Sequence, residues 1–461
     1  MTKENPEEPS VTRTQGREQT LNGLDRIRMA ARADKALRFN NLLHHITPQR
    51  LWESYHALKR DAAPGIDEVT WREYGEGLLG RLADLHERVQ SQRYRPRPSK
   101  RIYIPKADGR QRPIGIAALE DKIVQHAAGR ILGAIWEEDF ANFSYGFRPE
   151  RSQHKALDAL YVGITQRKVS WVLDADIRSF FDTLDHGWLM KFVAHRVSDP
   201  RMLRLVSRWL TAGVSEEGNW SKTTLGVPQG GVISPLLANI YLHYVLDLWS
   251  KQWRKQAGCG EVIIVRYADD FVMGFQSRKD AERCLEELKE RFAKFGLEIH
   301  PEKTRLIEFG RFANSNREAR GQGPAETFDF LGFTHICARR RSDGKFTVWR
   351  KTMAKRMRGK LQEIKEELRR RRHEPIPEQG SWLKAVVRGY FNYHAVPNNT
   401  DRLSAFRQQV GRIWLKALRK RSQKGRRLDW TRMNRIIQTW IPAVRVLHPY
   451  PDQRLCVNYS R

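Results

Sequence analysis

The amino-acid sequence predicts an α+β fold, in which an antiparallel sheet is backed by helices and followed by a helical region. Strand-like stretches at 170–177, 262–275 and 304–309 are separated by segments with helical spacing, an order similar to a split βαβ arrangement. From about residue 350 the apolar residues recur at helical spacing. The 461-residue chain is 40% hydrophobic, which allows ample packed core and about two to four domains.

The N-terminal part is predicted to be helical after a polar start. Residues 1–22 contain almost no apolar side chains, so we expect disorder there. The pattern from Leu24 to about Lys59 is helical and ends in a turn at Pro64-Gly65. A second helix is expected over about 71–91.

The middle of the chain alternates strands and helices. Residues 101–116 alternate apolar and basic side chains around Asp108-Gly109, which predicts a hairpin. Helices are expected over 118–138 and 152–167, and residues 169–177 are typical of a buried strand.

Four further helices are predicted from caps and spacing. After a glycine loop, Ser234 is expected as an N-cap with Pro235 at the first helical position. Ser277 and Asp280 suggest a capping box. Beyond residue 350, one helix is marked by Met353, Met357, Leu361, Ile364 and Leu368, and another by Leu403, Phe406, Val410, Ile413 and Ala417.

The charge of the chain indicates a polyanionic partner. Lys and Arg number 83 against 53 Asp and Glu, a net charge of +30 with a pI near 10.2. Nucleic acid is the first candidate, and a merely soluble basic protein is the alternative. The four cysteines lie far apart, no apolar run is long enough to cross a membrane, and the polar, acidic start is unlike a signal peptide. We therefore expect a cytoplasmic protein.

Two adjacent carboxylates, Asp269 and Asp270, stand in the most strand-like stretch, RYADDFVMGF (266–275). Like charges repel, and a buried charge needs a partner. In an antiparallel sheet Asp176, at the end of its own strand, can lie beside them. Such a cluster suits two Mg²⁺ ions for in-line phosphoryl displacement. The alternatives are that 267–270 is only a tight turn and that Asp176 caps a helix.

Several motifs, in this order, resemble the reverse transcriptase/maturase proteins encoded within bacterial group II introns. The resemblance covers residues about 41 to 450. The motifs are APGID (63–67), YIPKADGRQRPIGI (103–116), LEDKIVQ (119–125), SYGFRPERSQHKAL (144–157), DADIRSFFD (174–182), PQGGVISPLLANIYL (228–242), YADD, EKT and FLGF.

This resemblance implies a right-hand polymerase with fingers, a ferredoxin-like palm and an α-helical thumb. The expected domains are a disordered start (1–22), an N-terminal extension with the first fingers helices (23–95), fingers and palm (96–335), a helical thumb or maturase region (336–425), and a short basic DNA-binding-like segment without an endonuclease domain (426–461).

The resemblance also assigns site residues. Asp176, Asp269 and Asp270 would form the catalytic triad and bind two Mg²⁺ ions, with Asp176 and Asp269 as the principal ligands. Phe181 would stack under the incoming sugar and exclude a 2′-hydroxyl; the alternative is a core Phe on a helix. Lys303 would assist pyrophosphate departure as a proton donor or electrostatic stabiliser.

Other residues would hold the deoxynucleoside triphosphate. Lys106 and Arg112, on the hairpin, match a basic pair that grips the triphosphate, the alternative being solvated surface charges. Gln229 matches a residue placed by the ribose and nascent base pair. Asp182 and Asp185 are expected to cap the following helix rather than join the site.

The expected partners are group II intron RNA, an RNA template and a DNA primer or target, bound by a monomer or dimer. Arg369 to Arg372 are expected to contact phosphate, whereas Tyr390, Phe391, Tyr393 and His394 either stack unpaired bases or pack between helices. His44 and His45 fit a helix surface better than a metal site. The alternatives in function are a splicing scaffold whose polymerase is unused and an intron-free reverse transcriptase recruited to defence or repair.

Overall fold

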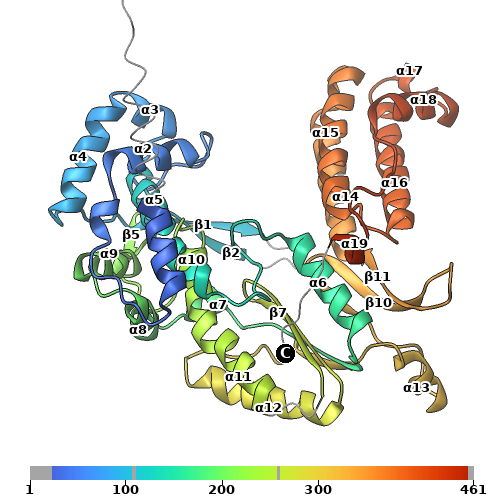
Figure 1. Cartoon of the computed structure of the whole chain (residues 1–461). Helices are drawn as coiled ribbons and strands as arrows, with labels where there is room; N and C mark the ends of the chain where they lie inside the picture. The colour runs from blue at the N-terminus through green and yellow to red at the C-terminus, as the bar shows by residue number, and fades with distance from the viewer. Residues whose placement is uncertain (1–22, 106–110, 257–259, 455–461) are drawn as a thin grey trace, which may run out of the picture.

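A computed structural model of the chain describes residues 23–105, 111–256 and 260–454. Figure 1 shows helices of the N-terminal part at upper left, a central region of sheet and helices, and a helical region at upper right. The structure confirms the predicted α+β class with antiparallel sheets. No helix within the described ranges is long and apolar enough to span a membrane.

The central sheet has the strand order β6-β7-β3-β8, and all its neighbouring strands are antiparallel. Its strands are β3 (Trp171–Ala175), β6 (Val262–Tyr267), β7 (Asp270–Phe275) and β8 (Arg305–Glu308). Alternate side chains enter different cores: Leu173 belongs to the same core as Phe292 of α12 (Arg278–Ala293), and Val172 to the same core as Leu160 of α6 (Gln153–Gln166). Helices therefore cover both faces of the sheet.

The predicted hairpin is present and belongs to a second sheet, of order β2-β1-β4-β5. Its strands are β1 (Ser99–Pro105), β2 (Gln111–Ile116), β4 (Val214–Glu216) and β5 (Asn219–Ser221). Strands β1 and β2 are antiparallel from Lys100↔Ile116 to Pro105↔Gln111. The parallel pairing of β1 with β4 joins segments far apart in the sequence.

A third sheet leads into the helical region. It contains β9 (Phe328–Phe330), β10 (Phe333–Arg339) and β11 (Phe346–Thr352), in the order β11-β10-β9. The stretch expected to be a helical thumb from residue 336 therefore begins with strands. Their alternating pattern, with Phe333, His335 and Cys337 buried, is the signal for this hairpin.

The helical region has its own core. Its helices are α14 (Ala354–Arg370), α15 (Ile376–His394), α16 (Thr400–Arg419), α17 (Gln423–Arg426) and α18 (Trp430–Trp440). Helices α14 and α16 confirm the two predicted from apolar spacing. The short α19 (Pro451–Arg454) returns to α6, where Arg454 Nε donates a hydrogen bond of 2.6 Å to buried Asp158.

The N-terminal part is helical, as predicted, but its second helix is divided. A helix over 23–33 is followed by η1 (Leu43–His45), α2 (Pro48–Ala57), α3 (Trp71–Gly75), α4 (Leu78–Gln90) and α5 (Leu119–Asp139). The predicted continuous helix over 71–91 is wrong, because Gly77 adopts φ 68° and separates α3 from α4. Glycine reaches this left-handed conformation without steric cost.

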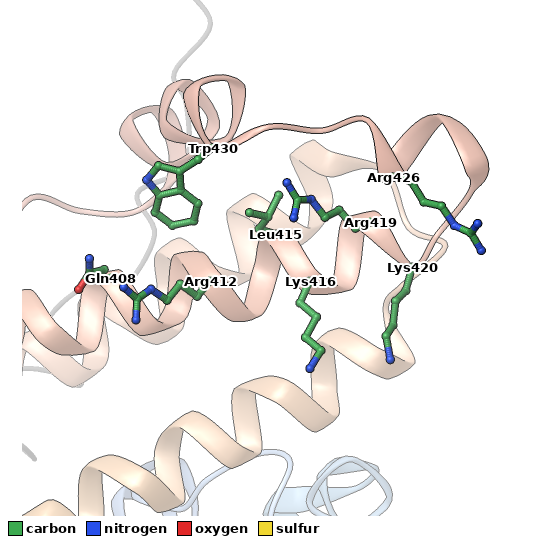
Figure 2. A pocket seen from close by; sticks show the side chains of 8 residues that line it. All are labelled: Gln408, Arg412, Leu415, Lys416, Arg419, Lys420, Arg426 and Trp430. Atoms are coloured by element: carbon green, nitrogen blue, oxygen red, sulfur yellow. The ribbon is translucent and has the colours of Figure 1, made fainter.

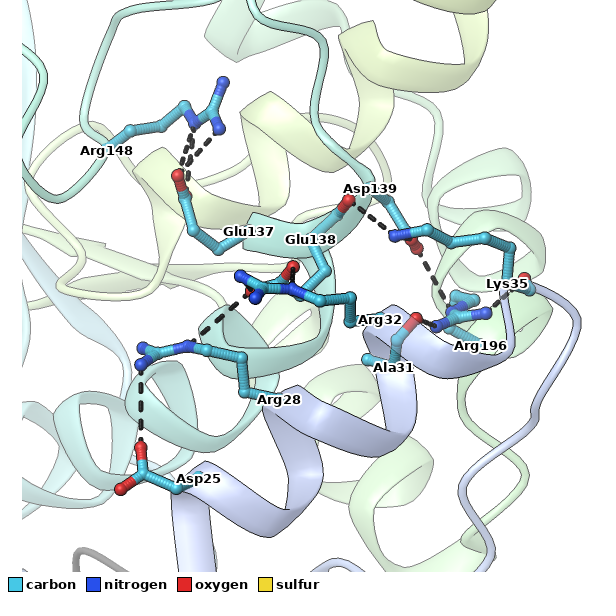
Figure 3. Close-up of polar contacts among 10 residues, drawn as sticks. All are labelled: Asp25, Arg28, Ala31, Arg32, Lys35, Glu137, Glu138, Asp139, Arg148 and Arg196. Carbon is cyan, nitrogen blue, oxygen red and sulfur yellow. Dashed lines mark hydrogen bonds and ion pairs between the residues drawn. The ribbon is translucent and has the colours of Figure 1, made fainter.

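Cations from three segments surround the acidic end of α5 (Figure 3). Carboxylates at a helix C-terminus oppose the helix dipole, so they require positive partners. These are the ion pairs Arg28–Glu138, Arg32–Glu138, Lys35–Asp139, Arg148–Glu137 and Arg196–Asp139. They join the 23–33 helix and its following loop to α5, and they join α5 to the last residue of the 186–196 helix.

The remaining helices belong to the middle of the chain. They are α7 (Phe180–Thr183), α8 (His186–Arg196), α9 (Pro200–Thr211), α10 (Ser234–Leu242), the π-helix η2 (His243–Asp247), α11 (Leu248–Gln256) and α13 (Ala313–Ala319). Ser234 is not an N-cap: Ile233 holds that position, and the buried Ser234 begins α10. Its backbone N–H bonds back to Gly231, which turns the chain into the helix. Ser277 caps α12 and Asp185 caps α8, whereas Asp182 lies within α7.

Candidate active site

Asp269 and Asp270 lie at the tip of the β6–β7 hairpin. The strands pair up to Tyr267↔Asp270, which leaves Ala268 and Asp269 as a two-residue turn. Ala268 adopts φ 57°, a conformation that such tight turns require and that residues other than glycine rarely adopt. One carboxylate thus occupies the turn and the other begins β7.

Asp176 lies at the same end of the sheet. Ala175, the last residue of β3, pairs with Phe271 of β7. Asp176 directly follows this pair, and its charge acts on both Asp269 and Asp270. The structure therefore brings the three carboxylates together from two neighbouring strands. The catalytic roles of these residues stay predictions.

Burial and the neighbouring carboxylates raise the pKa of Asp269 and of Asp270. Asp270 is reached by water but surrounded by protein on most sides; this poor solvation, with the charges of Asp269, Asp176 and Asp174, raises its pKa to about 7. Burial and the charge of Asp176 also raise the pKa of Asp269, which the cations Arg112 and Arg266 counteract. The site therefore favours a bound cation.

The chemistry of the carboxylates fits Mg²⁺, which prefers hard oxygen ligands. Within the described residues, however, no group of three or more His, Cys, Asp or Glu side chains is arranged so that it could hold a metal ion as it stands. Asp176 is instead paired with Lys303, whose Nζ lies 2.5 Å from Oδ2 of Asp176. Lys303 reaches it from the turn before β8, where the His300 backbone N–H donates to the Asp176 carbonyl at 2.8 Å.

A buried hydrogen-bond network around Arg266, which the sequence did not reveal, supports the turn that carries Asp269. Arg266 precedes Tyr267, and its guanidinium donates to both carboxylate oxygens of Asp247, at 2.7 and 2.5 Å. It also donates to the Ala268 carbonyl and to Asn239 Oδ1, each at 3.0 Å. Asp247 ends the π-helix η2, and π-turns are frequent at functional sites.

The free edge of β6 is covered by residues 143–146. Backbone bonds join Arg266 to Phe143 and Tyr145, and the Gly146 carbonyl accepts from Asn239 at 2.7 Å. A Cβ added at Gly146 would lie 2.2 Å from the Ala268 nitrogen. Only glycine permits this close approach to the turn.

Two of the predicted nucleotide-binding residues, Phe181 and Gln229, have backbone hydrogen bonds at the glycine loop. Phe181 is half-buried in α7, and its carbonyl accepts from the Val227 backbone N–H at 2.8 Å. The carbonyl of Gln229 accepts from Gly115 of β2 at 2.7 Å. Arg112 is exposed on β2 and acts electrostatically on Asp269. Lys106 lies outside the described residues.

The helical region decides between base stacking and helix packing for two of the aromatics, and it weakens the prediction that Arg369 to Arg372 contact phosphate. Tyr390 stacks on Phe406 with ring centroids 3.7 Å apart, and Phe391 is buried, so these aromatics pack between helices. Of the predicted phosphate-binding arginines, Arg370 and Arg371 pair with Glu367. In η1, burial lowers the pKa of His45 to about 4, and within the described ranges no metal-binding cluster surrounds it.

Comparison with known proteins identifies the family. Residues 104–335, which contain all three carboxylates, match the family described as reverse transcriptase (RNA-dependent DNA polymerase). The chain belongs to the reverse transcriptase family. It is thus an RNA-directed DNA polymerase by descent, in agreement with the prediction.

Similar proteins include several associated with introns. Protein YkfC of Escherichia coli K12 is 38% identical over 291 residues, which are 56% of this reverse transcriptase and 76% of YkfC. The group II intron-encoded protein LtrA of Lactococcus lactis is 35% identical over 205 residues, 43% of this chain and 33% of LtrA. A 91 kDa protein in the cob intron of Schizosaccharomyces pombe is 33% identical over 188 residues, 41% of this chain and 22% of that protein. The alignments therefore span a third or less of these two intron proteins.

Proposed function

We propose that this reverse transcriptase copies RNA into DNA at a site formed by Asp176, Asp269 and Asp270, with two Mg²⁺ ions and deoxynucleoside triphosphates as substrates. The observation that carries this proposal is the β3–β7 register, which brings the carboxylates to one end of the sheet. When bound, the metal ions would orient the primer hydroxyl and neutralise charge on the leaving phosphate oxygen.

The chain's own residues bind and orient the substrate. Arg112, together with Lys106, holds the triphosphate through charge-assisted hydrogen bonds. Phe181 lies below the sugar and leaves no room for a 2′-hydroxyl, so deoxynucleotides are selected. Gln229 lies beside the ribose and the nascent base pair.

Lys303 has a role at the leaving group. Its ammonium pairs with Asp176 in the structure, so it stands at the edge of the carboxylate cluster. From there it stabilises the negative charge of departing pyrophosphate, or supplies its proton.

The fold is assigned as a right-hand polymerase. Residues 96–335 form the fingers and palm, with the β1–β2 hairpin in the fingers and the sheet β6-β7-β3-β8 as the palm. Residues 23–95 are the N-terminal extension, 336–425 the thumb, and 426–461 a basic C-terminal segment. The separate core of the helical region, from Ile364 to Ile441, supports a thumb distinct from the palm, but it also includes buried residues of α18 beyond the boundary at 425.

The partner RNA is a group II intron, whose splicing and mobility the protein assists. The relatives' intron association and the net charge of +30 support this role. The alternatives are a splicing scaffold whose polymerase is unused and an enzyme recruited to defence or repair.

The decisive experiment is extension of a DNA primer on an RNA template by purified protein, with Mg²⁺ and with a chelator. The proposal expects DNA product only with the metal, and no product under either condition would contradict it. Splicing of the intron RNA that flanks the gene tests the second role: acceleration by the protein supports it, and the absence of an intron or of any effect contradicts it.

A further inference from the structure

The helical region contains a basic cavity that the polymerase site does not use. It has a volume of about 700 Å³, within the range of roughly 300–1,000 Å³ that small-molecule sites occupy. It lies along α16 and is bounded by α17 and the start of α18 (Figure 2). Its lining residues are Gln408, Arg412, Leu415, Lys416, Arg419, Lys420, Arg426 and Trp430.

The charge of this cavity is all of one sign. Five of the eight lining residues are Lys or Arg, and no described lining residue is acidic. Arg412, Lys416 and Arg419 lie on α16 at helical spacing, and Lys420, the C-cap of this helix, continues the same stripe. In the described part of the chain none of the five has an ion pair, in contrast to Arg371 on α14 and its acidic partners. Arg419 Nε donates to the Leu428 carbonyl at 2.8 Å, but no countercharge neutralises these cations, so they can attract an anionic ligand.

The aromatic wall of the cavity is Trp430, the first residue of α18. Asp429 fixes this helix start, since its carboxylate accepts from the Arg432 backbone N–H at 2.7 Å. A Cβ at Gly411 would lie 3.6 Å from the indole, so Trp430 rests against α16 at a residue without a side chain. Trp430 is nevertheless 38% exposed. Figure 2 shows the indole above α16, between Gln408 and Leu415.

An exposed indole among unpaired cations matches the chemistry of unpaired nucleotides. Bases of a single strand stack on aromatic rings, while Arg and Lys follow the phosphates. In a duplex the faces of the bases are already covered by their neighbours, so a paired nucleotide offers only its backbone charge. Gln408 adds an amide that can donate to and accept from the edge of a base.

We propose that this cavity binds one unpaired nucleotide of a single-stranded nucleic acid, with its base on Trp430 and its adjoining phosphates on Arg412 and Lys416. The proposal rests on the proposed function only in taking nucleic acid as the partner, and needs no polymerase activity. The site would anchor a strand at the helical region, away from the three carboxylates.

The test uses the full chain, first saturated with an unlabelled RNA-template/DNA-primer duplex that fills the extension site. A labelled single-stranded RNA decamer is then titrated, and its binding is followed by fluorescence anisotropy. Trp430→Ala should weaken binding about tenfold, since a base–aromatic stack contributes roughly 1–3 kcal/mol. Trp430→Phe should retain affinity within about threefold. A matched control is Trp220→Ala, because Trp220 is 59% exposed on β5.

A charge variant provides independent evidence. Lys416→Gln should reduce the slope of log affinity against log salt by about 0.7, the contribution of one phosphate contact in a single strand. Lys279→Gln, which removes an exposed charge on α12 at the far side of the molecule (Figure 1), should leave binding of the decamer unchanged.

The outcomes separate this site from the polymerase site. Unchanged decamer binding by Trp430→Ala, or an equal loss on a fully paired RNA hairpin, would overturn the proposal. A decamer of RNA and one of DNA with the same sequence show which strand it prefers. The Trp430→Ala variant should extend a primer at the normal rate. If the unaltered protein fails to extend a primer, that result counts against the proposed polymerase function but not against single-strand binding in this cavity.

Discussion

Asp247 and Arg266 form an ion pair with two hydrogen bonds in which neither side chain is exposed. Arg266 also donates to the carbonyl of Ala268, inside the turn that carries Asp269. A buried cation therefore joins the π-helix η2 to the turn of the candidate active site. We therefore expect the position of the turn, and of Asp269 within it, to depend on this ion pair.

Asp247→Asn should destabilise the protein and disturb the turn. The substitution keeps the shape of the side chain but leaves Arg266 buried without a countercharge, which typically costs about 3–5 kcal/mol. Urea unfolding should show this loss, and primer extension should fall with it. Glu282→Gln, which breaks the exposed Arg278–Glu282 pair, is the control and should change stability by no more than about 0.5 kcal/mol. A loss below about 1 kcal/mol for Asp247→Asn would show that the pair is not needed.

Gly146→Ala should impair catalysis more than folding. The added methyl group would stand 2.2 Å from the Ala268 nitrogen, so the turn has to move. Displacement of reacting groups by about 1 Å can reduce rates about 100-fold. Steady-state extension rates measure the effect. Gly133→Ala in α5, where nothing lies within 4 Å of the new Cβ, should leave the rate unchanged and stabilise the helix slightly. Equal rates for the two variants would contradict the close approach.

Phe181→Val should admit ribonucleotides. If the Phe181 ring excludes the 2′-hydroxyl, a smaller side chain leaves room for it, and the ratio of deoxynucleotide to ribonucleotide incorporation should fall at least about tenfold. Single-nucleotide extension with each substrate gives this ratio. Phe180→Val is the matched control: Phe180 is 2% exposed in the core, so its loss should lower the melting temperature without changing sugar selectivity. Unchanged sugar selectivity in Phe181→Val would contradict the proposal that the Phe181 ring excludes the 2′-hydroxyl.

His335 should make the protein less stable in acid. It is fully buried in β10 beside Arg350, and burial lowers its pKa to about 3. In the unfolded chain this imidazole binds a proton below about pH 6.5, whereas in the folded chain it stays neutral down to about pH 3. Its contribution to the free energy of unfolding is therefore full above pH 6.5 and is lost as pH falls toward 3. Between pH 6.5 and 5 this amounts to about 2 kcal/mol. Urea unfolding of His335→Gln should show a correspondingly weaker pH dependence, and the exposed His373→Gln should not. Equal pH dependence in His335→Gln and the unaltered protein would contradict this account.

Local patterns in the sequence predicted the elements that carry the carboxylates. The apolar runs of β3, β6 and β7 define strands by themselves, and the hypothesis of an antiparallel sheet then placed Asp176 near Asp270. The hairpin β1–β2 and the helices α14 and α16 were equally predictable, because alternation and helical spacing are local signals. Ser234 was misplaced since a serine before a proline fits an N-cap and a first turn about equally well.

Side-chain contacts between distant segments, apart from the proximity that the sheet implies for the carboxylates, could not be predicted. Arg266 looks like one more basic residue until the structure pairs it with Asp247. The aromatic run at 390–394 fits base stacking or core packing, and only the positions of Phe406, beside Tyr390, and Phe333, beside Tyr393, decide for the core. Similarly, Trp430 and Lys416 belong to separate stretches of sequence and form one cavity only after α16 and α18 have packed.

The central claim is most directly tested by primer extension on an RNA template with the double variant Asp269→Asn, Asp270→Asn. The two amides retain the shape of the turn but remove the negative charge that the proposed metal ions require. The account predicts that DNA synthesis is abolished while affinity for the RNA template stays within about twofold of the unaltered protein. DNA synthesis near the normal rate would contradict it.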